Sequence, residues 1–111
     1  MYNYIIAVDF DMTLSMAGWP YCGIPNLVLI NKLIDLRRNG AKVILWSCRS
    51  GEDERSAVEW CKSYGLEFDA VNENLPEIVE SWGGEDTRKI YADEYWDDKS
   101  VKIVFEEENS V

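Results

Sequence analysis

Segments patterned like buried strands alternate with segments of helical spacing along this chain, and this alternation constrains its fold more than any other feature. Tyr4 to Asp9 and Lys42 to Ser47 are short apolar runs, typical of strands that are buried on both faces. Apolar residues recur at helical spacing from Asn26 to Asn39-Gly40, and a second helix is expected from Ser50 to about Tyr64. Strand–helix–strand units of this kind predict a three-layer Rossmann-like α/β fold, in which a parallel sheet carries helices on both faces.

The helix ends carry recognisable signals. Asn26 is the expected N-cap of the first helix, and Ser50 with Asp53 has the spacing of a capping box for the second. In the second helix, Ala57, Val58 and Cys61 fall on one face, which predicts the side that packs on the core.

The second half of the chain is less regular. Phe68 to Val71 predicts a short third strand, Pro76 to Trp82 a brief helix, and Ile90 to Trp96 a fourth strand that is followed by two acids. Val101 to Phe105 fits either an edge strand or a last helical turn, and the pattern does not separate the two. No repeat or linker divides the chain, so residues 1–111 are expected to form a single domain with an acidic, disordered tail at 106–111.

Composition excludes several classes of function. The 21 acidic and 11 basic residues give a net charge of −10, which disfavours long nucleic acid and anionic membrane but suits a protein that gathers divalent cations. No segment approaches the roughly 20 apolar residues that a membrane span needs. The three cysteines, Cys22, Cys48 and Cys61, lack metal-ligand spacing and indicate a reducing, cytoplasmic location. The absence of histidine excludes His-based catalysis and His-ligated metals.

Acids follow the first strand in the segment DFDMT. In extended backbone, Asp9 and Asp11 would point to the same side, with Cα atoms roughly 6–7 Å apart. Both carboxylates could then face one Mg²⁺ ion or one phosphoryl group, because Mg²⁺ prefers hard oxygen ligands. One carboxylate could serve as nucleophile and the other as general acid and base. A strand cap and a turn residue are the structural alternative.

Other polar residues follow the later strands, and the carboxyl ends of parallel strands share one edge of a sheet. Ser47 could donate to a phosphoryl oxygen or simply cap its loop, and Arg49 could bind an anionic substrate or form a surface ion pair. Lys89 could neutralise a phosphoryl group, with Lys99 as a rival for that role. Adjacent acids point to opposite faces, so Asp97 rather than Asp98 is expected to face a metal.

The ordered series D-x-D-x-T, a hydrophobic run to Ser, Lys and then Asp-Asp resembles the four motifs of the haloacid dehalogenase (HAD) superfamily over residues 3–100. The segments GIPNLVLINKLIDLRRNGAKVILWSCRSG and KIYADEYWDD are similar to small cap-less members of bacterial and phage type. The resemblance implies a phosphatase that works through an aspartyl-phosphate on Asp9, with Asp11 protonating the leaving group and then activating water.

The same resemblance implies roles for the remaining motif residues. Thr13 would support the turn that holds the two acids, and Ser47 and Lys89 would bind phosphoryl oxygens. Independently of the resemblance, Thr13 and Arg49 are further candidates for the phosphate site. Magnesium would be held by the set Asp9, the Asp11 backbone carbonyl, Asp97 and Asp98.

One residue departs from the family pattern, and the intervals between motifs bear on the substrate. Met12 stands where the family often has glycine, which would narrow the entrance. The interval from Leu14 to Pro25 is too short for a lid domain, so an open site is expected. Such a site suits a small phosphorylated substrate, with a nucleotide favoured and Trp19 or Tyr21 either stacking on the base or packing the loop. The sequence leaves homo-oligomerisation open.

Three alternative functions share some of these residues. A receiver-like phosphoacceptor module uses similar groups, but its acid pair comes first and its lysine last, whereas this series ends in Asp97 and Asp98. A cysteine phosphatase needs five residues between its nucleophilic Cys and its Arg; counted from Cys48, that position is Glu54, and Arg55 comes one residue too late. A non-catalytic binding protein of the same fold remains an alternative.

Overall fold

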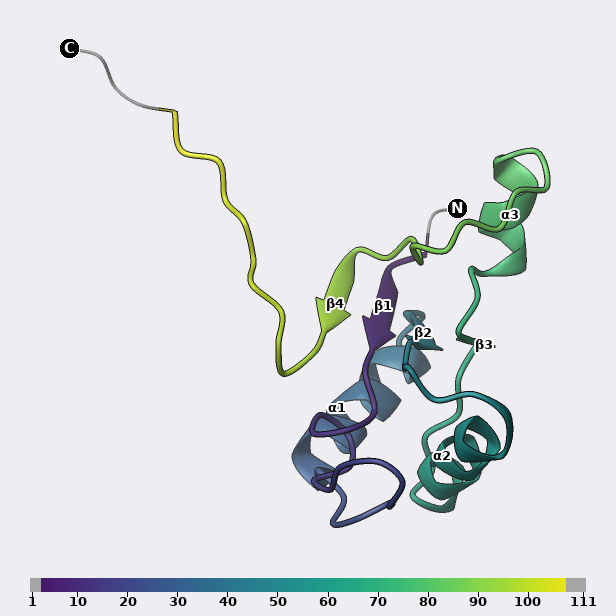
Figure 1. The fold of residues 1–111 in the computed structure, drawn as a ribbon. Coiled ribbons are helices and arrows are strands. Elements are labelled where there is room, and N and C mark those ends of the chain that lie inside the picture. Colours follow the sequence, from purple (N-terminus) through teal and green to yellow (C-terminus); the bar gives the residue numbers. More distant parts are fainter. Residues whose placement is uncertain (1–2, 108–111) are drawn as a thin grey trace.

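The structure, a computed structural model, describes residues 3–107 and contains one four-stranded, all-parallel sheet with helices packed against it (Figure 1). The strands are β1 (Ile5–Val8), β2 (Lys42–Leu45), β3 (Ala70–Val71) and β4 (Glu94–Trp96), and they lie in the order β3-β2-β1-β4. The helices are α1 (Leu27–Arg38), α2 (Gly51–Ser63) and α3 (Pro76–Ser81). The sequence prediction of an α/β parallel sheet is confirmed.

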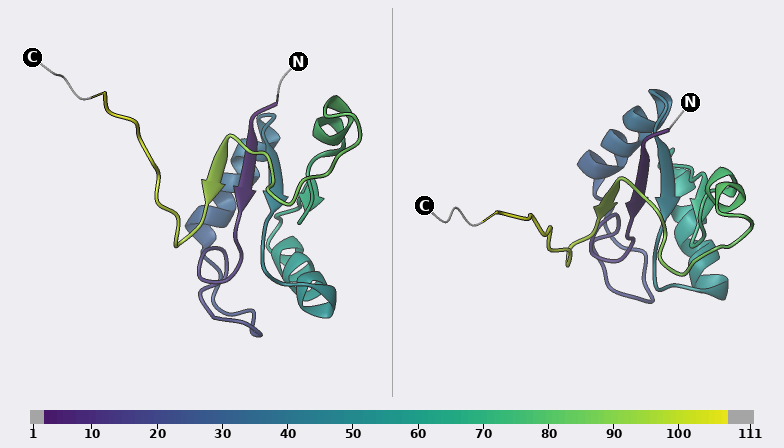
Figure 2. Two further views of the ribbon diagram at one scale, coloured as in Figure 1. Left: turned by 45° about the horizontal axis from the view of Figure 1, so that its top comes forward. Right: turned by 90° about the horizontal axis from the view of Figure 1, so that it is seen from above.

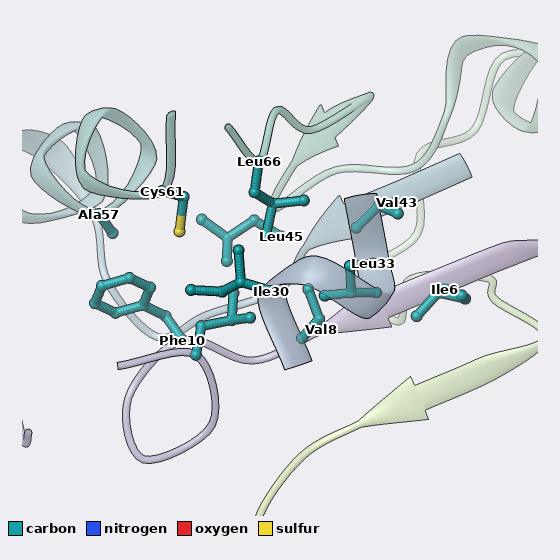
Figure 3. Packing of buried hydrophobic residues seen from close by; sticks show 11 residues of the cluster. Ile6, Val8, Phe10, Ile30, Leu33, Val43, Leu45, Ala57, Cys61 and Leu66 are labelled. Carbon is teal, nitrogen blue, oxygen red and sulfur yellow. The ribbon is translucent and has the colours of Figure 1, made fainter. Parts of the chain in front are cut away.

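The two faces of the sheet bury different sets of alternating residues. One cluster joins Ile6 and Val8 of β1 to residues of β2, α1 and α2, and Figure 3 shows Phe10, Ile30 and Cys61 directed toward its centre. Ile5 and Ala7 point the other way, into a cluster with Ile44, Ala70, Leu75 and Ile90, against which Ile78 of α3 packs. Because β1 is buried on both faces, its sequence IIAV is apolar throughout.

The helix ends confirm one expected cap and correct the other. Asn26 caps α1, and its side-chain oxygen accepts a hydrogen bond from the Leu29 backbone N–H. Ser50 occupies the N-cap position of α2 in extended conformation, but its side chain makes no capping hydrogen bond, so the predicted capping box is not formed. Gly40 follows the C-cap of α1 with a φ of +103°, a left-handed conformation that favours glycine.

The structure shortens the third and fourth strands relative to their expected lengths. β3 contains two residues where Phe68 to Val71 was expected, and β4 begins at Glu94 instead of Ile90. Asp93 explains the later start, because its carboxylate accepts from the Ile5 backbone N–H at 2.8 Å and replaces a ladder bond.

The chain from Val101 to Phe105 has neither of the two structures that the sequence left open. It is extended, without strand pairing or helix, and its apolar side chains are exposed. Figures 1 and 2 show this yellow segment leading away from the sheet beyond β4. Glu106 and Glu107 continue it, whereas residues 108–111 of the predicted acidic tail lie outside the described residues.

The strand order reverses beside β1. The chain moves from β1 to β2 and then β3 in one direction, and it returns across the sheet to β4 on the other side of β1. In open α/β sheets, ligands bind at such a reversal, outside the carboxyl ends of the strands. The residues that follow β1 and β4 are therefore expected to form the ligand site. Within residues 3–107, every helix is too short or too polar to cross a membrane.

Candidate active site at the carboxyl ends of the strands

Three carboxylates meet where β1 and β4 end. Asp9 follows β1, Asp97 and Asp98 follow β4, and one oxygen from each lies within 4.8 Å of the others. The register brings them together, because the Asp9 backbone N–H donates to the Trp96 carbonyl at 2.9 Å. The pKa of Asp9 is raised to about 6, mainly by burial; a Phe10 backbone hydrogen bond lowers it, and the negative charges of Asp97, Asp98 and Asp11 contribute to the rise. The expected convergence of Asp9 and Asp97 is found, and Asp98, which alternation placed on the other face, joins the same cluster.

Asp11 points to a different partner. Its two carboxylate oxygens accept from Nε and Nη2 of Arg49 at 3.1 and 2.7 Å. The Arg49 side chain is 1% exposed and that of Asp11 is 25% exposed, so this is a buried bidentate pair. The hydrogen bond to Asp11 raises the pKa of Arg49. The sequence expectation that Asp9 and Asp11 both face one ion is therefore not met by the Asp11 carboxylate.

Arg49 holds the loop between β1 and α1 as well as Asp11. Its Nη1 donates to the Pro20 carbonyl and to the Cys22 sulfur, and its Nη2 also donates to the Tyr21 carbonyl at 2.6 Å. Its guanidinium also lies 4.7 Å from the centre of the Phe10 ring. All five N–H groups are used, which argues against both the phosphate-binding role and the surface ion pair considered for Arg49.

The DFDMT segment folds into a tight turn that is anchored on both sides. The Phe10 carbonyl accepts from the backbone N–H groups of Thr13, Leu14 and Ser15, and both Phe10 and Leu14 are fully buried. Met12 has a φ of 63°, which explains why glycine suits this position. The Thr13 hydroxyl is buried without a hydrogen-bond partner among residues 3–107, an unusual state for a buried polar atom.

Ser47 is oriented by a residue that the sequence did not reveal. The Asn72 side-chain oxygen accepts from the Ser47 backbone N–H at 2.7 Å, and its nitrogen donates to the Arg49 carbonyl and to Glu54. The Ser47 hydroxyl oxygen accepts from the Arg49 backbone N–H, which leaves its proton free for donation elsewhere. Asn72 directly follows β3, so its place at a strand end was the available signal.

Lys89 lies in a segment that a second overlooked asparagine organises. Asn74 is 3% exposed; its side chain bonds Asp86, the Thr87 carbonyl and the Tyr91 backbone N–H.

Lys89 lines the same groove as Asp97 and Asp98, with its Nζ 6.0 Å from the centre of the Tyr95 ring. Lys99 does not line this groove, and its backbone N–H donates to Asp97. This placement favours Lys89 over Lys99 for contact with a bound phosphoryl group.

The groove itself is wide and open, with a volume of about 1000 Å³. Met12, Thr13 and Trp46 line it together with Tyr95 and the two acids that follow β4. Trp19 and Tyr21 do not line it. They are exposed on the loop that Arg49 holds, and the Trp19 indole donates to Asp53 at the start of α2. The base-stacking role considered for them therefore has no support from their position.

The acidic cluster fits a hard divalent cation. Three carboxylates at one point are oxygen donors of the kind that Mg²⁺ takes, and they repel one another unless a positive charge lies between them. Magnesium commonly keeps several waters and takes one or two carboxylates from a protein, so the exposure of Asp97 and Asp98 does not count against it. Within residues 3–107, Asp11 is not part of this cluster.

Comparison with known proteins gives one relative of similar structure. A solved structure described as that of a conserved protein from Bacteroides thetaiotaomicron is 38% identical in sequence to this chain and superposes with a TM-score of 0.78. The match covers 90% of this chain and 79% of that one. No family model and no curated protein matches the sequence.

Proposed function

We propose that this chain, which belongs to the family of the conserved Bacteroides thetaiotaomicron protein, is a magnesium-dependent phosphomonoester hydrolase of HAD type. The observation that carries the proposal is the half-buried Asp9 carboxylate, which faces Asp97 and Asp98 within 4.8 Å at the crevice between β1 and β4. A nucleophilic carboxylate in this position needs a cation to offset its acidic neighbours, and a phosphomonoester dianion needs the same cation.

The proposed reaction has two balanced steps. An Asp9 oxygen attacks phosphorus, the bond from phosphorus to the ester oxygen breaks, and Asp11 gives that oxygen a proton. Water then attacks phosphorus of the aspartyl-phosphate, Asp11 takes a proton from the water, and the bond to Asp9 breaks to release phosphate. Bound Mg²⁺, held by Asp9, Asp97 and Asp98, would supply positive charge that offsets the charge on the phosphoryl oxygens.

The remaining groups would bind and orient the phosphoryl group. The Ser47 hydroxyl has a proton to donate, and Lys89 brings a positive charge to the groove. The Thr13 hydroxyl, which has no hydrogen-bond partner within residues 3–107, could donate there as well. Arg49 instead holds Asp11 and the loop, so proton transfer requires the Asp11 carboxylate to release at least one of its two bonds to Arg49.

The finer features of the sequence prediction belong to the same proposal. The fold is taken as a three-layer Rossmann-like domain without a cap, because only a loop joins β1 to α1 and only the six-residue α3 lies between β3 and β4 in the described chain. A small phosphorylated molecule, with a nucleotide favoured, would reach the open groove in a cytoplasmic setting. Long nucleic acid is disfavoured by the net charge of −10.

The first test is phosphate release from a panel of nucleotides, phosphosugars and para-nitrophenyl phosphate, with Mg²⁺ and with chelator. The proposal expects release that requires Mg²⁺ and that Asp9→Asn reduces by more than about 10⁴-fold, as loss of a nucleophile does. The two side chains have nearly the same shape, so circular dichroism of the variant should match that of the wild type. Turnover by Asp9→Asn at the wild-type rate would rule out the nucleophile.

A non-catalytic binding protein of this fold is the competing function. It predicts no release from any member of the panel, although the ligand would still bind. A receiver-like module predicts labelling of Asp9 by a phosphodonor and a phosphoaspartate that persists for minutes or longer.

A further inference from the structure

The groove beside Asp9 has an aromatic wall on one side. Trp46 follows β2 and Tyr95 lies in β4, and their ring centres are 5.4 Å apart with a tilt of 52°. The two strands flank β1, whose Ala7 is paired with Ile44 and Tyr95. Because Ala7 has a small side chain, the two rings can meet across the central strand.

This wall and the Asp9 carboxylate belong to the same face of the sheet. Ala7 and Tyr95 both point into the cluster on that face. Asp9 follows Ala7 by two residues, and side chains two apart on a strand share a face. The register continues to that point, since the Trp46 backbone N–H donates to the Val8 carbonyl at 2.8 Å. Trp46 is thus level with Asp9 on the neighbouring strand.

The two rings differ in how firmly the surrounding structure holds them. Tyr95 is fixed, because its hydroxyl donates to the Ile90 carbonyl and accepts from the Ala92 backbone N–H. Trp46 is 38% exposed and lines the groove together with Met12, whose side chain is also exposed. An exposed aromatic ring in the groove that also contains Asp97 and Asp98 offers a flat contact surface for a ligand.

The size and charge of the groove restrict that ligand. About 1000 Å³ is at the upper end of the roughly 300–1,000 Å³ found for small-molecule sites, and it is far more than a phosphoryl group fills. Four acids line it, Asp93, Glu94, Asp97 and Asp98, against two lysines, Lys89 and Lys102. This balance disfavours a polyanion and leaves the neutral, flat part of a substrate to contact the aromatic wall.

We propose that Trp46, supported by Tyr95, forms a stacking subsite for the base of a nucleoside monophosphate whose phosphoryl group lies at Asp9. This inference rests on the proposed function and names its substrate class. A base stacked on one aromatic side chain gains enough binding free energy that its loss is worth about tenfold or more in affinity. The subsite therefore separates nucleotides from aliphatic phosphomonoesters, which have no ring to stack.

The test compares kcat/KM for adenosine monophosphate and glycerol phosphate in four proteins: wild type, Trp46→Ala, Trp46→Phe and Trp82→Ala. Trp82 is a matched control, because it is 41% exposed and packs against Tyr91 with ring centres 6.0 Å apart, yet it does not line the groove. We expect Trp46→Ala to lose about tenfold on the nucleotide alone, Trp46→Phe to recover most of it, and Trp82→Ala to match wild type on both substrates. An equal loss on both substrates, or no wild-type preference for the nucleotide, would overturn the subsite.

Binding measurements separate this inference from the proposed function. Calorimetry with adenosine monophosphate and Mg²⁺ uses Asp9→Asn, which keeps the ligand intact, with and without Trp46→Ala. Weaker binding in the double variant supports the subsite even if wild-type protein releases no phosphate, an outcome that would reject the hydrolase instead. Equal affinity in the two proteins would overturn the subsite whether or not phosphate is released.

Discussion

Asp9 and Asp11 are two residues apart in one turn, yet their carboxylates have opposite surroundings. Asp9 faces Asp97 and Asp98, and burial together with these like charges raises its pKa to about 6. Asp11 accepts two hydrogen bonds from the buried guanidinium of Arg49. The turn separates them, because Phe10 is buried between the two acids and Met12 takes a left-handed conformation directly after them.

The chain neutralises the Asp11 carboxylate with its own arginine but supplies no such partner for Asp9 within the described residues. Arg49 completes the Asp11 side, and the same guanidinium fixes the loop carbonyls of Pro20 and Tyr21. The Asp9 side is left with an excess of negative charge that an external cation can offset. The Asp11 side of the turn is therefore neutralised within the fold, whereas the Asp9 side keeps its excess negative charge.

Removal of Arg49 should have the largest effect on stability. Arg49→Ala leaves Asp11 without its partner and frees the loop, so we expect the free energy of unfolding to fall by about 3 kcal/mol, near the lower end for a broken buried pair because Asp11 is partly exposed. Urea denaturation measures it. Arg38→Ala is the control: both side chains of its pair with Asp35 are exposed, and its loss should cost about 1 kcal/mol or less. Equal losses would mean that the Asp11–Arg49 pair has no special role.

Magnesium should stabilise the protein through the Asp9 side alone. At 100 times its Kd, a ligand specific for the folded state adds about 2.7 kcal/mol to the free energy of unfolding. We expect this gain in wild type, a much smaller gain in Asp9→Asn, and an undiminished gain in Asp11→Asn, although the last variant starts from lower stability. Thermal unfolding with Mg²⁺ and with chelator measures all three. A full gain in Asp9→Asn would place the cation elsewhere.

The sequence predicted the features of the site that depend only on where the strands end. Asp9 and Asp97 each follow an apolar run, and parallel strands bring their carboxyl ends to one edge, so their convergence required no knowledge of side-chain packing. Asn26 was likewise predictable, because capping is a local interaction.

Other parts depend on contacts that sequence spacing does not contain. Arg49 meets Asp11 only because the loop after β1 folds back over it, and local sequence patterns give no measure of that approach. Sequence spacing also fails to show which tryptophan faces the groove. Trp19 lies in a loop and Trp46 follows β2, and only the register of β2 shows that Trp46 lines the groove. Val101 to Phe105 fits an edge strand or a helical turn by its sequence but forms neither in the described chain.

Met12 offers a smaller test of how the turn separates the acids. A non-glycine residue with positive φ costs roughly 1–2 kcal/mol, whereas glycine loses about 0.5–1 kcal/mol more chain entropy on folding. Met12→Gly should therefore raise the free energy of unfolding by about 0.5 kcal/mol, and it would remove a side chain from the groove wall. Met16→Gly is the control, because Met16 is equally exposed and lacks the positive φ, so that change should destabilise the protein.

Repulsion within the acidic cluster should give the smallest effect. In chelator, Asp98→Asn removes one of the charges that crowd Asp9, and we expect a gain of a few tenths of a kcal/mol because Asp98 is exposed and screened. Glu85→Gln, at an exposed acid outside the cluster, should leave stability unchanged. With Mg²⁺ present, the sign for Asp98→Asn should reverse, since a ligand is lost along with the repulsion. A gain of the same size with and without Mg²⁺ would show that Asp98 takes no part in binding the cation.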